Sequence, residues 1–303
     1  MISLDRRRFL SLTAATAVSS SFVQQAKAES SEPLKSNPIA VFTKPFNSLS
    51  FDELAESIAE LGFDGIEAPI RKGGHIEPAN VADELPRLVE ALDKCKLKVT
   101  VLTSDINDAS DPESQNVIRT AATLGIKRYR MKYMKYSSDQ PIADQLANWK
   151  PQFEDLAALN HDYGVIGLYQ NHAGVNYMGA SIWDLAQVLE GISPTDIAMA
   201  YDIRHATVEG GTSWPTTYQM IKDHIDTVYV KDFAWEKGKV VNVPLGQGLV
   251  SEKFFAMLKA DSFSGPISLH EEYLDHRPAE LVPKHLAAIK DDMGLLKSWL
   301  GRS

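Results

Sequence analysis

Cysteine and net positive charge are both scarce in this sequence. Cys95 is the one cysteine among the 303 residues, which excludes an intramolecular disulfide and a cysteine-rich zinc site. Lys and Arg number 31 against 40 Asp and Glu, so the formal net charge is -9. Binding to nucleic acid needs clustered basic residues, so we do not expect a nucleic-acid partner.

Long apolar segments are also missing after the N-terminal region, so we expect no membrane span. Hydrophobic residues make up 44% and charged residues 23% of the chain. This is enough apolar material for a sizeable core, and the chain lacks the bias of a disordered protein. The length alone leaves one large domain or two small ones open.

The N-terminus has the pattern of an export signal. Arg6–Leu10 is basic and ends in Phe-Leu, residues 11–23 form a modestly apolar run, and Ala26–Ala28 supplies small residues for cleavage. We therefore predict a signal peptide over residues 1–28 that resembles the twin-arginine type and directs export to the periplasm. The alternative interpretation is a basic amphipathic helix.

After a polar tether over residues 29–38, the folded domain over 39–303 alternates short apolar runs with longer amphipathic stretches. Helical spacing of apolar residues is clear in Ser50–Leu61 and Val81–Lys94, and such alternation is typical of βα units around a parallel sheet. The eight candidate strands are Ile39–Thr43, Gly65–Ala68, Lys98–Thr103, Arg128–Lys132, Gly164–Gln170, Ile197–Asp202, Thr227–Lys231 and Pro266–Glu271.

Eight βα units in one domain of this size predict an α/β fold, a single (β/α)₈ TIM barrel. The main alternative is an open, doubly wound sheet, which would need a glycine-rich phosphate turn after its first strand. The segment Phe42–Phe46 contains no glycine. The closed barrel is therefore favoured.

Histidines and charged residues gather at the carboxyl ends of the predicted strands, where barrel enzymes hold their catalytic groups. A single histidine there is more often structural, but several together with carboxylates favour a site. Four of the eight histidines follow strands in this way, namely His75, His172, His205 and His270.

The strand ends also offer donors for a metal and a buried cation. Asp202, His270 and Glu272 can present carboxylate and imidazole to a divalent metal. His270 and Glu272 share one face of their strand, whereas Glu271 points away. Lys231 ends an apolar strand, where an ammonium must be paired or used. Both a carboxylate partner and a role in polarising a substrate stay open for it.

These patterns define two sets of candidate residues. His205 can equally contact a metal or a substrate hydroxyl, Arg130 suits a phosphate or carboxylate, and Trp214 offers a stacking face for a sugar ring. The predicted catalytic residues are His270, Glu272, Lys231 and His205. The predicted substrate-binding residues are His75, Arg130, His172, Trp214 and Tyr229.

Six short segments occur in an order that is more specific than any one of them. They are Phe63–Glu67, Tyr169–His172, Tyr201–His205, Val230–Asp232, Pro244–Gly248 and Gly265–Leu269. In this order they resemble the xylose-isomerase-like barrel superfamily, which includes sugar epimerases and inosose dehydratases. The resemblance covers nearly all of residues 39–300.

The resemblance implies one divalent metal, Mn, Mg, Zn or Co, held by Glu, Asp, His and Glu on the last four strands. In this sequence those positions are Gln170, Asp202, Tyr229 and His270, so only the aspartate is kept. We predict Gln170, Asp202 and His270 as the metal ligands. A register shift of one residue would bring in Glu271 in place of His270.

The resemblance further implies a sugar isomerase or epimerase that abstracts, with assistance from the metal, a proton next to the carbonyl of a sugar or keto-sugar. The amide of Gln170 cannot act as a second base, which favours isomerisation or elimination over symmetric epimerisation. The alternatives are a lyase or dehydratase acting on an oxidised sugar and a carbohydrate-binding barrel that does not catalyse. DNA repair is disfavoured by the acidic charge.

Overall fold

The structure is a computed structural model that describes residues 37–302. The predicted signal peptide over 1–28 and most of the predicted tether lie outside the described residues. All eight predicted strands are present, with ends shifted by a few residues. They are β1 Ile39–Phe42, β2 Gly65–Ile70, β3 Lys98–Ser104, β4 Arg128–Arg130, β5 Ile166–Gln170, β6 Ile197–Asp202, β7 Ile225–Val230 and β10 Ile267–Leu269.

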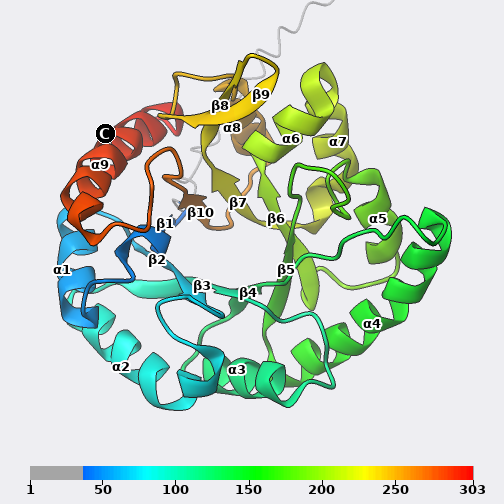
Figure 1. Cartoon of the computed structure of the whole chain (residues 1–303), viewed down its shortest axis with the longest axis horizontal. Helices are drawn as coiled ribbons and strands as arrows, with labels where there is room; N and C mark the ends of the chain where they lie inside the picture. Colours follow the sequence, from blue (N-terminus) through cyan, green and yellow to red (C-terminus); the bar gives the residue numbers. More distant parts are fainter. Residues whose placement is uncertain (1–36, 303) are drawn as a thin grey trace, which may run out of the picture. The chain divides into compact units, whose positions relative to one another are not determined.

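These strands are parallel and close on themselves in the order β1-β10-β7-β6-β5-β4-β3-β2. The first strand closes the barrel, because β1 pairs with β2 on one side and with β10 on the other. Figure 1 shows the strands at the centre with helices around them. The predicted (β/α)₈ TIM barrel is therefore confirmed.

Helices follow the strands and cover the barrel from outside. Within residues 37–302, none combines the length and the apolar composition of a membrane-spanning segment. The α-helices are α1 Phe51–Glu60, α2 Val81–Lys94, α3 Pro112–Thr123, α4 Ile142–Tyr163, α5 Trp183–Leu189, α6 Ile203–Gly210, α7 Trp214–Ile221, α8 Lys253–Ala260 and α9 Val282–Trp299. Single-turn helices are η1 Lys44–Phe46, η2 Pro78–Asn80, η3 Gly211–Ser213, η4 Lys222–His224 and η5 Ala279–Leu281.

Local sequence explains where these helices start and which side they bury. In α1, Ser50 and Glu53 form a capping box that satisfies free amides of the first turn. Leu54 and Ile58, four residues apart, are fully buried against the barrel. The same spacing buries one face of α2. These helices therefore form where the apolar periodicity predicts them.

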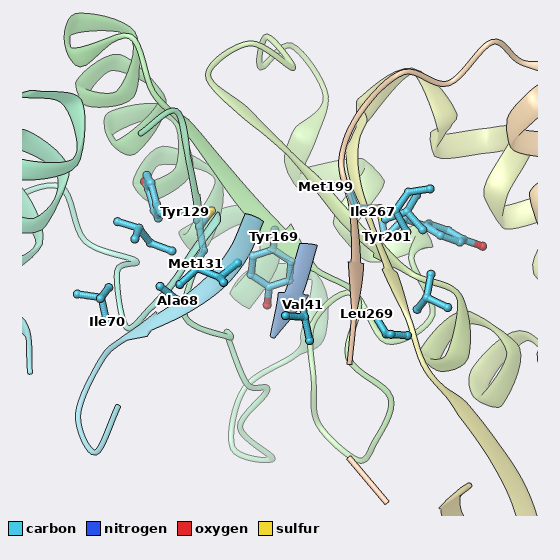
Figure 2. Close-up of a cluster of buried hydrophobic side chains, with 14 of the residues drawn as sticks. Val41, Ala68, Ile70, Tyr129, Met131, Tyr169, Met199, Tyr201, Ile267 and Leu269 are labelled. Carbon is cyan, nitrogen blue, oxygen red and sulfur yellow. The ribbon is translucent and has the colours of Figure 1, made fainter. Parts of the chain in front are cut away.

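Side chains alternate along each strand between two apolar layers. The layer between strands and helices is the larger and contains Tyr169, Met199 and Leu269 (Figure 2). The layer inside the barrel is small and includes Leu168 and Ala200. Above this inner layer, toward the carboxyl ends of the strands, the inward positions are polar. The alternation thus places the polar strand ends inside the mouth of the barrel.

The sequence did not predict the antiparallel hairpin formed by β8 Asp232–Glu236 and β9 Lys239–Val243. Its first strand follows β7 almost directly, so the two are hard to separate by pattern. Asp232 fixes the next loop by accepting hydrogen bonds from the amides of Gly246, Gly248 and Val250. A Cβ at Gly248 would lie 2.2 Å from the Phe233 carbonyl oxygen. The Pro244–Gly248 segment therefore has a structural role.

A buried pair joins the end of β10 to α9 and provides a test of the fold. Glu271 accepts a hydrogen bond from His285, and their side chains are completely buried. Replacing His285 with Ala leaves Glu271 Oε2 without its donor, whereas Oε1 keeps the amides of Tyr273 and Leu274. We expect the free energy of unfolding to fall by about 1–3 kcal/mol in urea denaturation. His161→Ala removes a histidine that is 75% exposed beside Asp196 and should change little. Equal small losses for the two variants would contradict this assignment.

Candidate functional site

Six polar side chains meet inside the carboxyl ends of the strands, and we call them the strand-end cluster. They come from β2, β5, β6 and the residues just after β7 and β10, so barrel closure is needed to bring them together. All but Glu272, whose side chain is 25% exposed, are buried. The cluster consists of Glu67, Gln170, Asp202, Lys231, His270 and Glu272.

Lys231 lies between two carboxylates. Its Nζ donates to Glu272 Oε2 at 2.9 Å and lies 3.2 Å from Asp202 Oδ2. Burial by itself would lower the pKa of this ammonium, but the two carboxylates outweigh burial and raise the pKa above its ordinary value. Burial would likewise raise the pKa of Glu272, but Lys231 and then His270 hold it well below its usual range. The Lys231 side chain is therefore a protonated ammonium at neutral pH.

Asp202 is held by more groups than Lys231 alone. Its Oδ1 caps α6 by accepting from the His205 amide at 3.0 Å. Its Oδ2 accepts from Gln170 Nε2 at 2.8 Å and lies 3.4 Å from His205 Nε2. These contacts fix the direction of the carboxylate.

Glu67 and His270 form a second buried pair, from strands 203 residues apart in the chain. Glu67 Oε2 lies 2.8 Å from His270 Nε2 and accepts from Ser268 Oγ at 2.7 Å, and Thr103 donates to the other oxygen. Burial would raise the pKa of Glu67, but the charge and hydrogen bond of His270 dominate and lower it to about 2. An ionised Glu67 only accepts, so the hydrogen of this bond belongs to His270 Nε2.

This bond decides what His270 can offer to a ligand. Its Nδ1 has no hydrogen-bond partner among residues 37–302 and lies 4.0 Å from Glu272 Oε1. Because Nε2 is held by Glu67, Nδ1 is the ring nitrogen left to face a ligand. The pair therefore has the arrangement of a carboxylate-oriented base.

The sequence reasoning missed Glu67 as a functional residue. It appeared only within the Phe63–Glu67 segment of the family resemblance. The available signal was a lone carboxylate in the otherwise apolar strand β2, two positions after Gly65 and so on the same face. Buried carboxylates are almost always paired, which would have marked Glu67 for attention.

Gln170 does not fit the predicted role of a metal ligand. Its carbonyl oxygen accepts from Arg130 at 3.2 Å and from the Tyr133 hydroxyl at 2.6 Å, and its amide nitrogen donates to Asp202. An arginine can only donate and a carboxylate can only accept, so these partners fix the orientation of the amide. The carbonyl oxygen of Gln170 is therefore already used, and it faces away from Asp202.

The rest of the cluster does not fit a divalent metal either. Within residues 37–302 there is no group of three or more His, Cys, Asp or Glu side chains placed to hold a metal ion. Asp202 and Glu272 are instead joined by the ammonium of Lys231, and the Nε2 of His270 is taken by Glu67. The Lys231 ammonium thus occupies the position between Asp202 and Glu272 where the two carboxylates could otherwise bind one metal ion. The metal set predicted as Gln170, Asp202 and His270 is therefore not assembled.

Two further predicted histidines line the same end of the barrel. The rings of His172 and His205 lie 4.2 Å apart. His205 accepts from Arg204 at Nδ1, 2.9 Å away, and burial followed by Lys231 keeps its pKa well below its ordinary value. Burial and Lys231 also lower the pKa of His172 to about 4. Both rings are therefore neutral near pH 7.

The structure does not bring His75 and Trp214 to the cluster. His75 Nε2 lies 2.9 Å from the Leu49 carbonyl oxygen, and its ring packs on Phe51 at the start of α1. Trp214 begins α7 and packs edge-on against Phe254 of α8. Both side chains pack against the helical layer here, and their contact with a substrate stays a prediction. Tyr229 does reach the cluster, with its ring 4.4 Å from that of His270.

A cavity of about 360 Å³ lies at the opposite end of the barrel. Its lining includes Pro38, Lys98, Arg128 and Pro266, at the amino ends of their strands. Barrel enzymes work at the carboxyl ends. We therefore keep the candidate site at the strand-end cluster.

The fold and the position of this cluster define an α/β barrel whose site lies at the carboxyl ends of its strands. The chain belongs to the Xylose isomerase-like TIM barrel family, which matches residues 55–299. None of the curated proteins matches it significantly in sequence.

Several solved structures share the fold. A 3-keto-D-glucoside 4-epimerase from E. coli superposes with a TM-score of 0.66 at 15% identity, covering 86% of this chain and 99% of its own. A xylose isomerase domain protein from Planctomyces limnophilus gives 0.67 at 14%, covering 87% and 97%. A probable 3-DHS dehydratase from Bacillus anthracis gives 0.64 at 15%, covering 86% and 98%. At these identities the similarity establishes the fold alone.

The ammonium of Lys231 predicts how the site responds to metal. We expect the wild-type protein to leave the Mn²⁺ electron paramagnetic resonance signal of free ion unchanged at neutral pH. Gln170→Glu combined with Lys231→Met removes the cation and adds a third carboxylate beside Asp202 and Glu272, which suits Mn²⁺. This double variant should bind one Mn²⁺ per chain.

Lys231→Arg is the matched control, because it keeps a cation between the carboxylates and should stay metal-free. The assignment fails if wild-type protein binds one Mn²⁺ that Asp202→Asn abolishes. It fails equally if the double variant folds, as judged by circular dichroism, and does not bind the ion.

Proposed function

We propose that this protein is a carbohydrate isomerase or epimerase that moves a proton at a carbon next to a carbonyl group. The observation that carries the proposal is the buried Glu67–His270 pair, in which the free Nδ1 lies 4.0 Å from Glu272. A carboxylate that fixes the imidazole in this way is suited to general-base catalysis. Membership of the Xylose isomerase-like TIM barrel family supports the substrate class.

The proposed reaction uses residues of this chain alone. His270 Nδ1 takes the proton from the carbon, and the electrons of the broken C–H bond form a C=C bond and leave negative charge on the former carbonyl oxygen. Lys231 stabilises that oxygen, since its contacts with Asp202 and Glu272 leave at least one of its three N–H groups free. His270 then returns the proton to the former carbonyl carbon. The hydroxyl proton of the neighbouring carbon passes to the former carbonyl oxygen, which leaves a new carbonyl at the neighbouring carbon and completes an aldose–ketose isomerisation.

A single oriented base favours isomerisation over symmetric epimerisation. The amide of Gln170 lies at the position implied for a second base and cannot take up a proton. Elimination, as in the dehydratase named among the similar structures, is the second candidate, because it also needs one base next to a carbonyl. From the sequence of residues 1–28 we further propose that the enzyme acts in the periplasm.

Exchange with heavy water tests the proposal. Wild-type protein incubated with a panel of keto-sugars in D₂O should place deuterium on the carbon next to the carbonyl, as measured by NMR and mass spectrometry. His270→Gln should slow exchange by about 10²–10⁴-fold, because it removes the base. Glu67→Gln should also slow it, since the ring loses its fixed tautomer.

The control is His161→Gln, which changes an exposed histidine on α4 and should leave exchange unaltered. Carbohydrate binding without any exchange across the panel would instead support the alternative of a non-catalytic binding barrel. Exchange that persists at the wild-type rate in His270→Gln would disprove the assigned base.

A further inference from the structure

The mouth of the barrel holds more positive charge than its carboxylates neutralise. Lys231 is paired with Asp202 and Glu272, and Glu67 is paired with His270. Several other cations at this end form no ion pair within 4.0 Å among residues 37–302, and three of them influence one another electrostatically. These three are Lys44 in η1, Arg71 after β2 and Arg130 at the end of β4, and we call them the mouth cations.

Arg130 is the most unusual of the three, because it is only 5% exposed. Its guanidinium donates to the uncharged Gln170 at 3.2 Å and lies 4.8 Å from the ring centroid of Tyr133. Arg71 is half-buried with its guanidinium 5.8 Å from the Phe42 ring. Burying a charge without a counter-charge is costly. For Arg130, nearby groups that include Glu67 and Glu272 outweigh burial and raise the pKa. Burial and then Arg130 lower the pKa of Arg71, so Arg71 carries such a cost.

The mouth cations also lie close enough to repel one another. Burial lowers the pKa of Lys44, and Arg71, Lys231 and Arg130 lower it further against the opposing effect of Glu272. Burial and then Arg130 lower the pKa of Arg71. The chain as a whole has a net charge of -9, yet these three cations without ion pairs lie at the same end of the barrel. An anion among them would relieve both burial and repulsion.

Their position relative to the proposed base is also defined. The Phe42 ring contacts both groups, with its centroid 4.8 Å from that of the His270 ring and 5.8 Å from the Arg71 guanidinium carbon. Arg71 and His270 therefore share one aromatic neighbour, and a ligand whose charged end meets Arg71 lies near His270.

We propose that Lys44, Arg71 and Arg130 form an oxyanion subsite, and that the substrate is a carbohydrate carrying a carboxylate or a phosphate group. That the bound carbohydrate is a substrate rests on the proposed function, whereas binding of an anionic carbohydrate does not. Arginine is suited to the task because its planar fork matches carboxylate and phosphate oxygens in pairs. Neutral sugars leave the mouth cations unpaired and so bind weakly.

Calorimetry at constant ionic strength tests the subsite. Wild-type protein is titrated with glucuronate, glucose 6-phosphate and neutral glucose, which share a sugar ring and differ in charge. We expect at least one of the two anionic sugars to bind about tenfold or more tightly than glucose, and which of them does so identifies the anionic group. Arg71→Gln and Lys44→Gln should each remove most of that preference.

The matched control is Lys72→Gln, which removes an exposed cation next to Arg71 in the sequence and should keep the preference. Circular dichroism confirms that each variant folds. Equal affinity for glucose and both anionic sugars, or a preference that survives in both Arg71→Gln and Lys44→Gln, would overturn the subsite.

Deuterium exchange separates this inference from the proposed function. Tight binding of an anionic sugar without exchange of any substrate would support the subsite and contradict the proposed isomerase activity. Neutral keto-sugars could instead exchange as fast as their acidic counterparts, at a rate that Arg71→Gln does not change. That result would support the isomerase activity and contradict the subsite.

Discussion

The site depends on the pairing of the buried Lys231 ammonium with Asp202 and Glu272. A buried charge must be balanced, and removing one partner of such a pair costs about 3–5 kcal/mol. This requirement connects the ends of three strands, because Asp202 ends β6, Lys231 follows β7 and Glu272 follows β10. It also reaches the helical layer, since Asp202 caps α6. The geometry of the other polar groups follows from this balance.

A fixed cation at this point changes the chemistry that the barrel can perform. Gln170 turns its amide nitrogen toward Asp202, and its oxygen goes to Arg130 and Tyr133. The set of oxygen donors that a divalent ion needs is thereby lost. Within the Xylose isomerase-like TIM barrel family, this chain thus places a side-chain ammonium where carboxylates could share a metal. In the proposed function, the base and the electrostatic stabiliser are therefore both side chains of the protein.

The sequence predicted the fold well because barrel strands and their helices are local patterns. Apolar periodicity located all eight strands, and the strand ends marked His270, Glu272, Lys231 and His205 as neighbours. What the sequence could not supply were contacts made by barrel closure. Glu67 meets His270 across 203 residues, and nothing near either residue predicts that contact. Side-chain direction was equally hidden, so nothing in the sequence indicated that Gln170 turns its oxygen to Arg130 and Tyr133, or that His75 and Trp214 pack beside helices.

The protonation state of Lys231 tests this account most directly. Nitrogen-15 NMR of lysine side chains, with Lys231→Arg used to assign its resonance, reports the titration of that one ammonium. We expect Lys231 to stay protonated beyond pH 10.5, the ordinary pKa of lysine, because Asp202 and Glu272 together outweigh the effect of burial. Titration at or below that value would show that the two carboxylates do not hold the ammonium, and the account of the site would be wrong.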